Sequence, residues 1–303
     1  MMLIRRTLVV GATAALLSSV FVGTASAGEL EDVLAEASGS TYTASRLVVS
    51  IWGGETQVSR EFVERSDGME MIRRDASWSM AGKGKAVSMG DEPAGITFLT
   101  RDRSISSSRY TIIERDKATH MSRPCRLVDV MEGDQLRATF VVDDRSGALL
   151  IQELYTDGGD LFRRTTLSDF RAYRTYEAPA DGAQVPVEVV MHEDAYLLPE
   201  AVSGYQLVDA FGAPGGSEQG FFADGLFSFS LFILDEDTVV SGFEDSMAFV
   251  SASGIYEMVP TAHAVRLHWQ DGSNNYVLVG NLPPDHVADV LAELPEPAGQ
   301  GMW

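Results

Sequence analysis

The stretch ADGLFSFSLFIL, from Ala223 to Leu234, joins an acid-glycine turn to a segment whose two sides differ. Large apolar residues occupy every second position: Phe227, Phe229, Leu231 and Ile233. The other side begins with the small polar residues Ser228 and Ser230. Because side chains alternate between the two faces of a strand, this pattern predicts a strand with one face buried in a core.

A terminal helix supplies a matching apolar surface. In the stretch YVLVGNLPPDHVADVLAEL (276–294), four residues recur at helical spacing: Val287, Val290, Leu291 and Leu294. Pro284 and Asp285 suit the first turn of this helix. Further strand patterns lie between the two stretches, so this half of the chain predicts a small α+β domain.

The preceding half of the chain predicts an antiparallel meander. A short amphipathic helix from about Leu30 ends at Gly39, and the segments 46–52 and 57–65 flank a Gly-Gly hairpin signal. Short strand patterns with tight turns continue to about Tyr176. The segment 177–187, EAPADGAQVPV, is rich in Pro, Gly and Ala and predicts a linker.

Charge separates the same two halves. Residues 28–177 carry 20 basic and 25 acidic side chains, whereas residues 178–303 carry 19 acidic side chains and a single basic one, Arg266. A net charge of −21 for the whole chain repels nucleic acid and anionic lipid headgroups, so no nucleic-acid partner is expected. The acidity of the second half could steer a basic partner or serve only solubility.

The N-terminus predicts export. Arg5 and Arg6 precede an apolar segment, which ends in the small-x-small pattern Ala25-Ser26-Ala27, so a cleavable signal peptide is expected over residues 1–27 and the mature protein outside the cytoplasm. The lone cysteine, Cys125, allows no internal disulfide.

Catalytic patterns are missing from the sequence: there is no metal-ligand spacing of histidines, no serine-hydrolase elbow and no phosphate-binding loop. We therefore expect no enzyme, no cofactor and no metal. Two other groups of residues could bind a ligand. The aromatic and methionine residues Trp52, Met69, Met71 and Trp78 suit either an acyl-chain site or an ordinary core. Arg73 and Arg74 could hold an anionic group or be solvated strand residues.

The two C-terminal stretches closely resemble the RseB/MucB family of periplasmic regulators of the envelope-stress sigma factor. The resemblance rests on FFADGLFSFSLFI (221–233) and YVLVGNLPPDHVADVLAEL (276–294), with LLPEAVSGYQLVDAF (197–211) as an entry strand. Upstream, DDRSGALLIQELYTDGGDLFRRTTLSDF (143–170) is similar to the lipoprotein carriers LolA and LppX.

The resemblance implies an α+β fold: a large, curved antiparallel half-barrel sheet with helices in its concavity (LolA-like), and a small C-terminal α+β domain. The domains are then 28–177 and 188–303, with a flexible linker at 178–187 that lets the small domain change its docking. The implied partner is the periplasmic part of a membrane-spanning anti-sigma factor, shielded from proteolysis. An amphiphile, lipopolysaccharide or lipoprotein acyl chains, would release the anti-sigma factor. The sequence does not decide whether the protein forms a homodimer.

The resemblance places Asp224, Gly225, Phe227, Ser228, Phe229 and Ser230 among the partner-binding candidates, beside the aromatic, methionine and arginine residues named above. The apolar side of the strand is expected to pack on the terminal helix. The serine side is expected to face the large domain or an incoming peptide. The alternative function is a periplasmic lipid or lipoprotein carrier of the LolA type.

Overall fold

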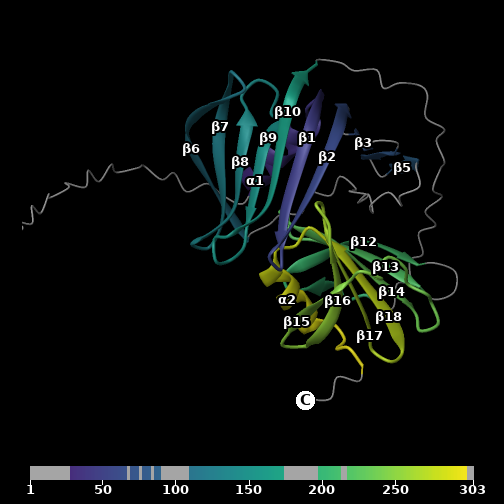
Figure 1. Cartoon of the computed structure of the whole chain (residues 1–303). Helices are drawn as coiled ribbons and strands as arrows, with labels where there is room; N and C mark the ends of the chain where they lie inside the picture. The colour runs from purple at the N-terminus through teal and green to yellow at the C-terminus, as the bar shows by residue number, and fades with distance from the viewer. Residues whose placement is uncertain are drawn as a thin grey trace, which may run out of the picture.

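The computed structural model describes residues 28–66, 69–74, 77–82, 85–89, 109–173, 197–212 and 217–298. Within them the chain forms two antiparallel sheets and two helices (Figure 1). The predicted signal peptide, 1–27, and the predicted linker, 178–187, lie outside the described residues. Neither helix of the described part is long and apolar enough to cross a membrane.

The first sheet has ten strands in the order β5-β4-β3-β2-β1-β10-β9-β8-β7-β6, and its outer strands do not pair with each other. Its strands are β1 (Tyr42–Trp52), β2 (Glu55–Ser66), β3 (Met69–Arg74), β4 (Ser77–Gly82), β5 (Lys85–Met89), β6 (Tyr110–His120), β7 (Arg123–Glu132), β8 (Gln135–Asp143), β9 (Leu149–Tyr155) and β10 (Leu161–Ala172). The open, curved antiparallel sheet predicted from the sequence is confirmed.

The predicted Gly-Gly hairpin joins β1 to β2. Trp52 pairs with Glu55 across the turn, and Gly53 and Gly54 both have positive φ, +56° and +85°. Only glycine adopts two such residues in a row without steric cost, which is why this pair forms the tight turn.

Helix α1 (Gly28–Gly39) covers part of the first sheet. Leu30 and Val33 of the helix are buried in one cluster with Ile112 of β6 and Val128 of β7. The family resemblance implies several helices in the concavity of this sheet. Within the described residues, α1 is the helix that packs on it.

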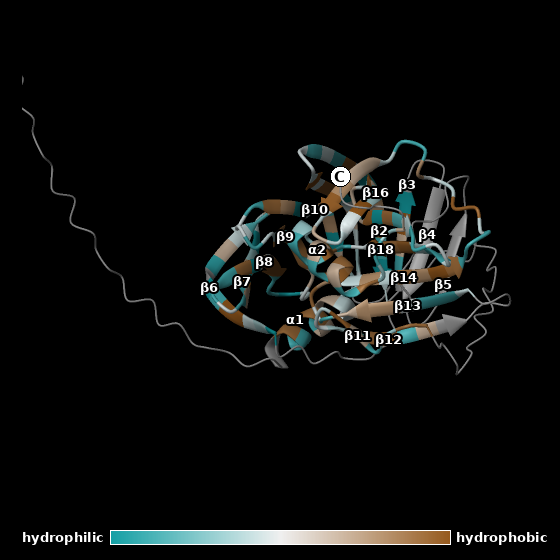
Figure 2. Cartoon of the chain, turned by 90° about the horizontal axis from the view of Figure 1, so that it is seen from below, coloured by the Kyte–Doolittle hydropathy of each residue, from teal (hydrophilic) through white to brown (hydrophobic). Residues whose placement is uncertain are grey.

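The second sheet has eight strands in the order β11-β12-β13-β14-β18-β17-β16-β15. They are β11 (Ala201–Val202), β12 (Tyr205–Gly212), β13 (Glu218–Ala223), β14 (Ser228–Asp235), β15 (Met247–Ser251), β16 (Gly254–Pro260), β17 (Val265–Gln270) and β18 (Asn274–Gly280). Helix α2 (Pro284–Glu293) follows the last strand. Figure 2 shows β14 hydrophobic along most of its length.

The packing predicted for the apolar side of β14 agrees with the structure. Phe229 and Leu231 are fully buried in the same cluster as Val287 and Leu291 of α2. The prediction that the serine side faces the large domain or an incoming peptide stays a prediction. Ser230 lies opposite Phe221 of β13, which belongs to a small separate cluster with Val208 and Ala223.

One hydrophobic core runs through both sheets. The same cluster holds Leu30 of α1, Phe140 of β8, Phe227 before β14 and Leu291 of α2. The sequence predicts two domains joined by a flexible linker; in the described residues, separating the two sheets would expose the apolar surface of this shared core to water. The exact domain boundaries stay a prediction, since the first sheet ends at Ala172 and the second begins at Ala201.

Candidate functional site: the junction of the two sheets

The Asp224-Gly225 turn lies where the two sheets meet. Asp224 is 3% exposed, and its Oδ1 accepts hydrogen bonds from the backbone N–H of Leu226 (3.0 Å) and Phe227 (2.8 Å). Gly225 has φ +96°, which favours glycine. The other carboxylate oxygen, Oδ2, accepts a 2.6 Å hydrogen bond from the Tyr110 hydroxyl of β6. One side chain therefore shapes the turn and binds the first sheet.

Phe227 provides the apolar part of the contact between the two sheets. Its ring lies edge-on to Tyr110, with centroids 6.4 Å apart, and tilted against Phe162 of β10 at 6.2 Å. It also meets His286 of α2 edge-on at 5.3 Å. Aromatic pairs at these separations and angles add to the energy of burial. Phe227 thus belongs to the core of both sheets.

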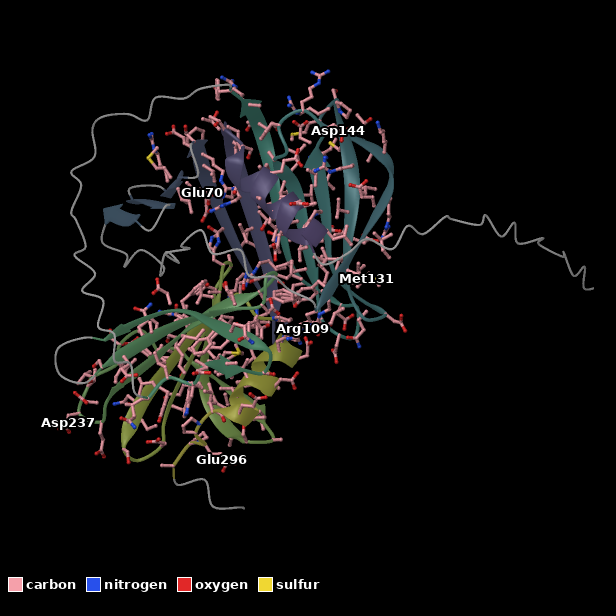
Figure 3. All side chains as sticks on the ribbon, turned by 180° about the vertical axis from the view of Figure 1, so that it is seen from behind. Glu70, Arg109, Met131, Asp144, Asp237 and Glu296 are labelled. Carbon is pink, nitrogen blue, oxygen red and sulfur yellow. The ribbon has the colours of Figure 1, made fainter. Side chains whose placement is uncertain are left out.

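Charged side chains surround this aromatic contact. We call the following set the junction cluster: Arg109, Tyr110, Glu132 and Arg137 of the first sheet, with Tyr205, Asp224, Asp285 and His286 of the second. Figure 3 labels Arg109 where the first sheet meets α2.

Arg137 is the buried centre of the junction cluster. Its side chain is fully buried, and its Nη2 donates to Asp285 Oδ2 at 2.6 Å. Its Nε lies 3.1 Å from Glu132 Oε2. Breaking a buried ion pair leaves an uncompensated charge, so these contacts fix α2 against β7 and β8.

His286 connects the other members of the cluster. Its Nδ1 lies 2.5 Å from the Tyr205 hydroxyl. Its Nε2 lies 2.5 Å from Arg137 Nη2, 3.2 Å from Arg109 Nη2 and 3.4 Å from Glu132 Oε2. A neutral ring accepts from the guanidinium groups, whereas a protonated ring donates to the carboxylate. His286 thus contacts Arg109, Arg137 and Glu132 of the first sheet and Tyr205 of the second.

Burial and charge shift the pKa values of this cluster. Burial raises the pKa of Tyr110, and the neighbouring charge of Asp224 adds to the effect. Burial works against ionised Glu132, but hydrogen bonds from His286 and Arg109 outweigh it and lower its pKa to about 2. These shifts favour an ionised Glu132 and a neutral Tyr110, which suits charge-assisted hydrogen bonds.

A second contact joins the sheets at the β1–β2 hairpin. The Ser50 hydroxyl of β1 donates to the Thr261 carbonyl at 2.8 Å, and Glu61 of β2 lies 2.6 Å from His263 Nε2. Both partners are in the loop between β16 and β17. The first sheet is thus bound to the second at this loop as well as at the junction cluster.

Comparison with known proteins identifies this arrangement. No protein-family profile matches the sequence, and no curated protein does. Among solved structures, MucB matches with a TM-score of 0.54 and 18% identity, covering 88% of this chain and 96% of MucB. MucB in complex with MucA(peri) matches with a TM-score of 0.53 and 20% identity over 90% of this chain and 100% of that chain. The MucA/MucB complex of Pseudomonas aeruginosa gives 0.51 and 19%, over 89% of this chain and 100% of that chain.

The chain has the MucB fold. The resemblance to the RseB/MucB family that the sequence predicts is therefore confirmed at the level of the fold. Both sheets take part in the match, because it extends over nearly nine-tenths of the chain.

Within this MucB fold, the predicted site residues separate into two groups. Asp224, Gly225 and Phe227 lie at the junction, and Phe229 is buried beside them, stacked on Phe222 at 4.9 Å. Ser228 and Ser230 lie on the opposite side of β14. Asp224 contacts the first sheet through Tyr110, and Phe227 contacts it through Tyr110 and Phe162.

Two of the aromatic and methionine candidates, Trp52 and Met71, lie far apart on the first sheet. Trp52 is buried at the hairpin end of β1, whereas Met71 pairs with Glu64 near the far end of β2. Nine residues of extended strand separate Glu64 from Glu55, the partner of Trp52, which is about 30 Å. The side chains of Met69, Trp78 and Arg74 lie outside the described residues.

Arg73 is an exposed residue of β3 with partners of its own. Its Nη2 lies 3.5 Å from Glu64, and its guanidinium lies 6.0 Å from the ring centre of Phe62. This contact agrees with the solvated-strand alternative.

Sequence patterns carry little information on the first-sheet half of the junction cluster. Arg109, Tyr110, Glu132 and Arg137 lie at strand ends in ordinary surroundings of mixed charge. An arginine between apolar residues of a strand, as in the sequence LRATFVV, was the one available sign for Arg137.

Proposed function

We propose that this chain is a periplasmic regulator that binds the periplasmic segment of a membrane-spanning anti-sigma factor and shields it from proteolysis. An amphiphilic envelope ligand releases it. The observation that carries the proposal is the match to MucB over most of both chains, including structures of MucB with MucA. The export signal and the family resemblance of the C-terminal stretches support it further.

The junction supports a regulator whose two sheets act as one unit. A ligand shifts the arrangement of two bodies only by binding one arrangement better than the other. In this chain the junction cluster and the shared core together favour one arrangement. An amphiphile that inserts apolar chains between the sheets competes with this core, and it thereby changes the surface offered to a bound segment.

Binding, and no covalent chemistry, is the activity we propose. The charged groups of the junction pair with one another, and the apolar groups fill the core.

The test measures two properties of the purified chain. Isothermal titration with the periplasmic segment of the anti-sigma factor from the same organism is expected to show a complex at micromolar concentration. Protease digestion of that segment is expected to slow in the presence of the chain, and lipopolysaccharide or an acylated lipoprotein peptide is expected to restore it.

A matched pair of variants links the activity to the junction. Asp224→Asn weakens the contact between the sheets and is expected to change segment binding, whereas Asp237→Asn alters an exposed carboxylate and is not. Absence of any complex would refute the proposal. Binding of acyl chains without any effect on the segment would favour a carrier.

A further inference from the structure

Arg163 of β10 is a buried cation without a counter-charge. The residue is 5% exposed, and its Nε and Nη2 are buried and donate no hydrogen bond. Its one described interaction is with the ring of Phe162, whose centre lies 5.5 Å from the guanidinium carbon. Burial alone lowers its pKa to about 10, with no carboxylate to oppose the shift. Such a charge destabilises the free protein.

The two unpartnered atoms form the edge of the guanidinium that binds carboxylates. Arg123 of the same sheet shows the arrangement when it is filled: its Nε and Nη2 donate to the two oxygens of Asp143, each at 2.8 Å. This side-on, two-bond geometry is the preferred pairing of arginine with a carboxylate. Arg163 presents the same pair of donors with no acceptor.

A second unpartnered donor lies beside Arg163. Trp52 is 1% exposed, and its Nε1 is buried without a hydrogen-bond partner. Arg163 pairs directly with Ser50, and Trp52 follows two residues later on the same face of β1. The ring of Phe162 meets both side chains, since its centroid lies 6.5 Å from that of Trp52. Three unpartnered N–H donors therefore belong to two side chains that both contact the ring of Phe162.

We propose that Arg163 and Trp52 bind the carboxylate of a fatty acid. Two carboxylate oxygens match the paired donors of Arg163, and a single negative charge is neutralised by a single guanidinium. A phosphate headgroup would bring additional charge and oxygens that these donors do not satisfy. The alkyl chain suits the neighbouring rings of Trp52 and Phe162, which belong to the core shared by both sheets.

The position of the site couples it to the junction. Ser50, directly opposite Arg163, donates its hydroxyl to Thr261 of the second sheet. A fatty acid held at Arg163 therefore lies next to one of the two contacts between the sheets. This inference rests on the amphiphile part of the proposed function and adds the chemistry of the ligand.

The experiment uses dodecanoate and the purified full chain, without any partner. Isothermal titration is expected to show binding of dodecanoate, at least tenfold weaker binding of dodecyl phosphate, and none of dodecanol. Arg163→Met is expected to lower dodecanoate affinity at least tenfold. Arg163→Lys keeps the charge but lacks the paired donors, and it is expected to lose affinity as well. The control is Arg164→Met, next in sequence but exposed and 3.4 Å from Glu153, which is expected to bind like the wild type.

Melting temperature separates a binding role from a structural one. Arg163→Met removes an unpaired buried charge, so the ligand-free variant is expected to melt higher than the wild type, and dodecanoate is expected to raise only the wild-type value. A lower melting point or a variant that fails to fold would show that Arg163 is structural, and the proposal would be wrong. Unchanged dodecanoate affinity in the variant, or binding of an acidic peptide in place of dodecanoate, would also overturn it. If the chain binds the anti-sigma segment but not dodecanoate, the fatty-acid site is refuted and the proposed function stands. If it binds dodecanoate but not the segment, the anti-sigma partner is refuted and the fatty-acid site stands.

Discussion

The Tyr110–Asp224 hydrogen bond offers a direct measure of how tightly the two sheets are coupled. Both side chains are buried, at 1% and 3% exposure, and their oxygens lie 2.6 Å apart. Tyr110→Phe removes this bond and leaves the ring in place. Because a hydrogen bond to a charged group contributes about 1.5–3 kcal/mol, we expect the free energy of unfolding to fall by about 2 kcal/mol.

Asp224→Ala is expected to cost more, about 3–5 kcal/mol, because the carboxylate also accepts the N–H groups of Leu226 and Phe227. The double variant isolates the bond between the sheets. Its coupling energy with Tyr110→Phe is expected to be about 1.5–3 kcal/mol. Tyr155→Phe provides the control, because that hydroxyl donates to Glu153 at 2.8 Å within one sheet and in partial contact with solvent.

Urea denaturation followed by tryptophan fluorescence and by circular dichroism measures these differences. The continuous core predicts that both signals change in one transition, since unfolding either sheet exposes the other. If Tyr110→Phe lowers the free energy of unfolding no more than Tyr155→Phe does, the Tyr110–Asp224 bond does not couple the two sheets. Two separate transitions in the wild type would contradict the shared core itself.

Three further predictions concern residues of the described sheets. Gly280→Ala would place a methyl group 2.6 Å from a β-carbon and 2.9 Å from a carbonyl oxygen of β14, so we expect a loss of about 1–3 kcal/mol in thermal unfolding, whereas Gly39→Ala, with nothing within 4 Å, should be nearly neutral. The folded-state pKa of Glu132 is lowered to about 2, so its contribution, at most about 3 kcal/mol, is present above pH 4.5 and is lost as the pH falls towards 2; Glu132→Gln should show a flatter loss of stability across that window. Arg137→Met leaves the partly buried Glu132 and Asp285 without their cation and should cost about 3–5 kcal/mol in urea, against less than about 0.5 kcal/mol for Arg164→Met at an exposed position.

The strands and helices were predictable because local patterns determine them. The alternation from Phe227 to Ile233 predicts β14, and the spacing of Val287, Val290 and Leu291 predicts α2. The order of strands in the sheets was harder to predict. β1 pairs with β10, more than a hundred residues away, and no local signal specifies such a pair.

The candidate site was predictable only in part for the same reason. The Asp224-Gly225 turn has a sequence signal, but its partner Tyr110 does not, because a tyrosine at the start of a strand is common. Trp52 was recognised by its residue type and assigned to a cluster with Met71, although they lie far apart on the sheet. Residue type therefore indicated which side chains were unusual, while the topology decided which of them meet.

The shared core limits how this protein can respond to a ligand. If the sheets were joined only by a linker, a guest could move one of them at little cost. Here a movement of the second sheet withdraws Phe227 from Tyr110 and Phe162 and separates buried Arg137 from Asp285. A ligand that drives this change must compensate for these lost contacts. It must supply apolar surface to the core and a charge to an unpaired group. The fatty-acid site proposed at Arg163 provides both, because its carboxylate neutralises a cation that the free protein leaves unpaired and its chain substitutes for core surface.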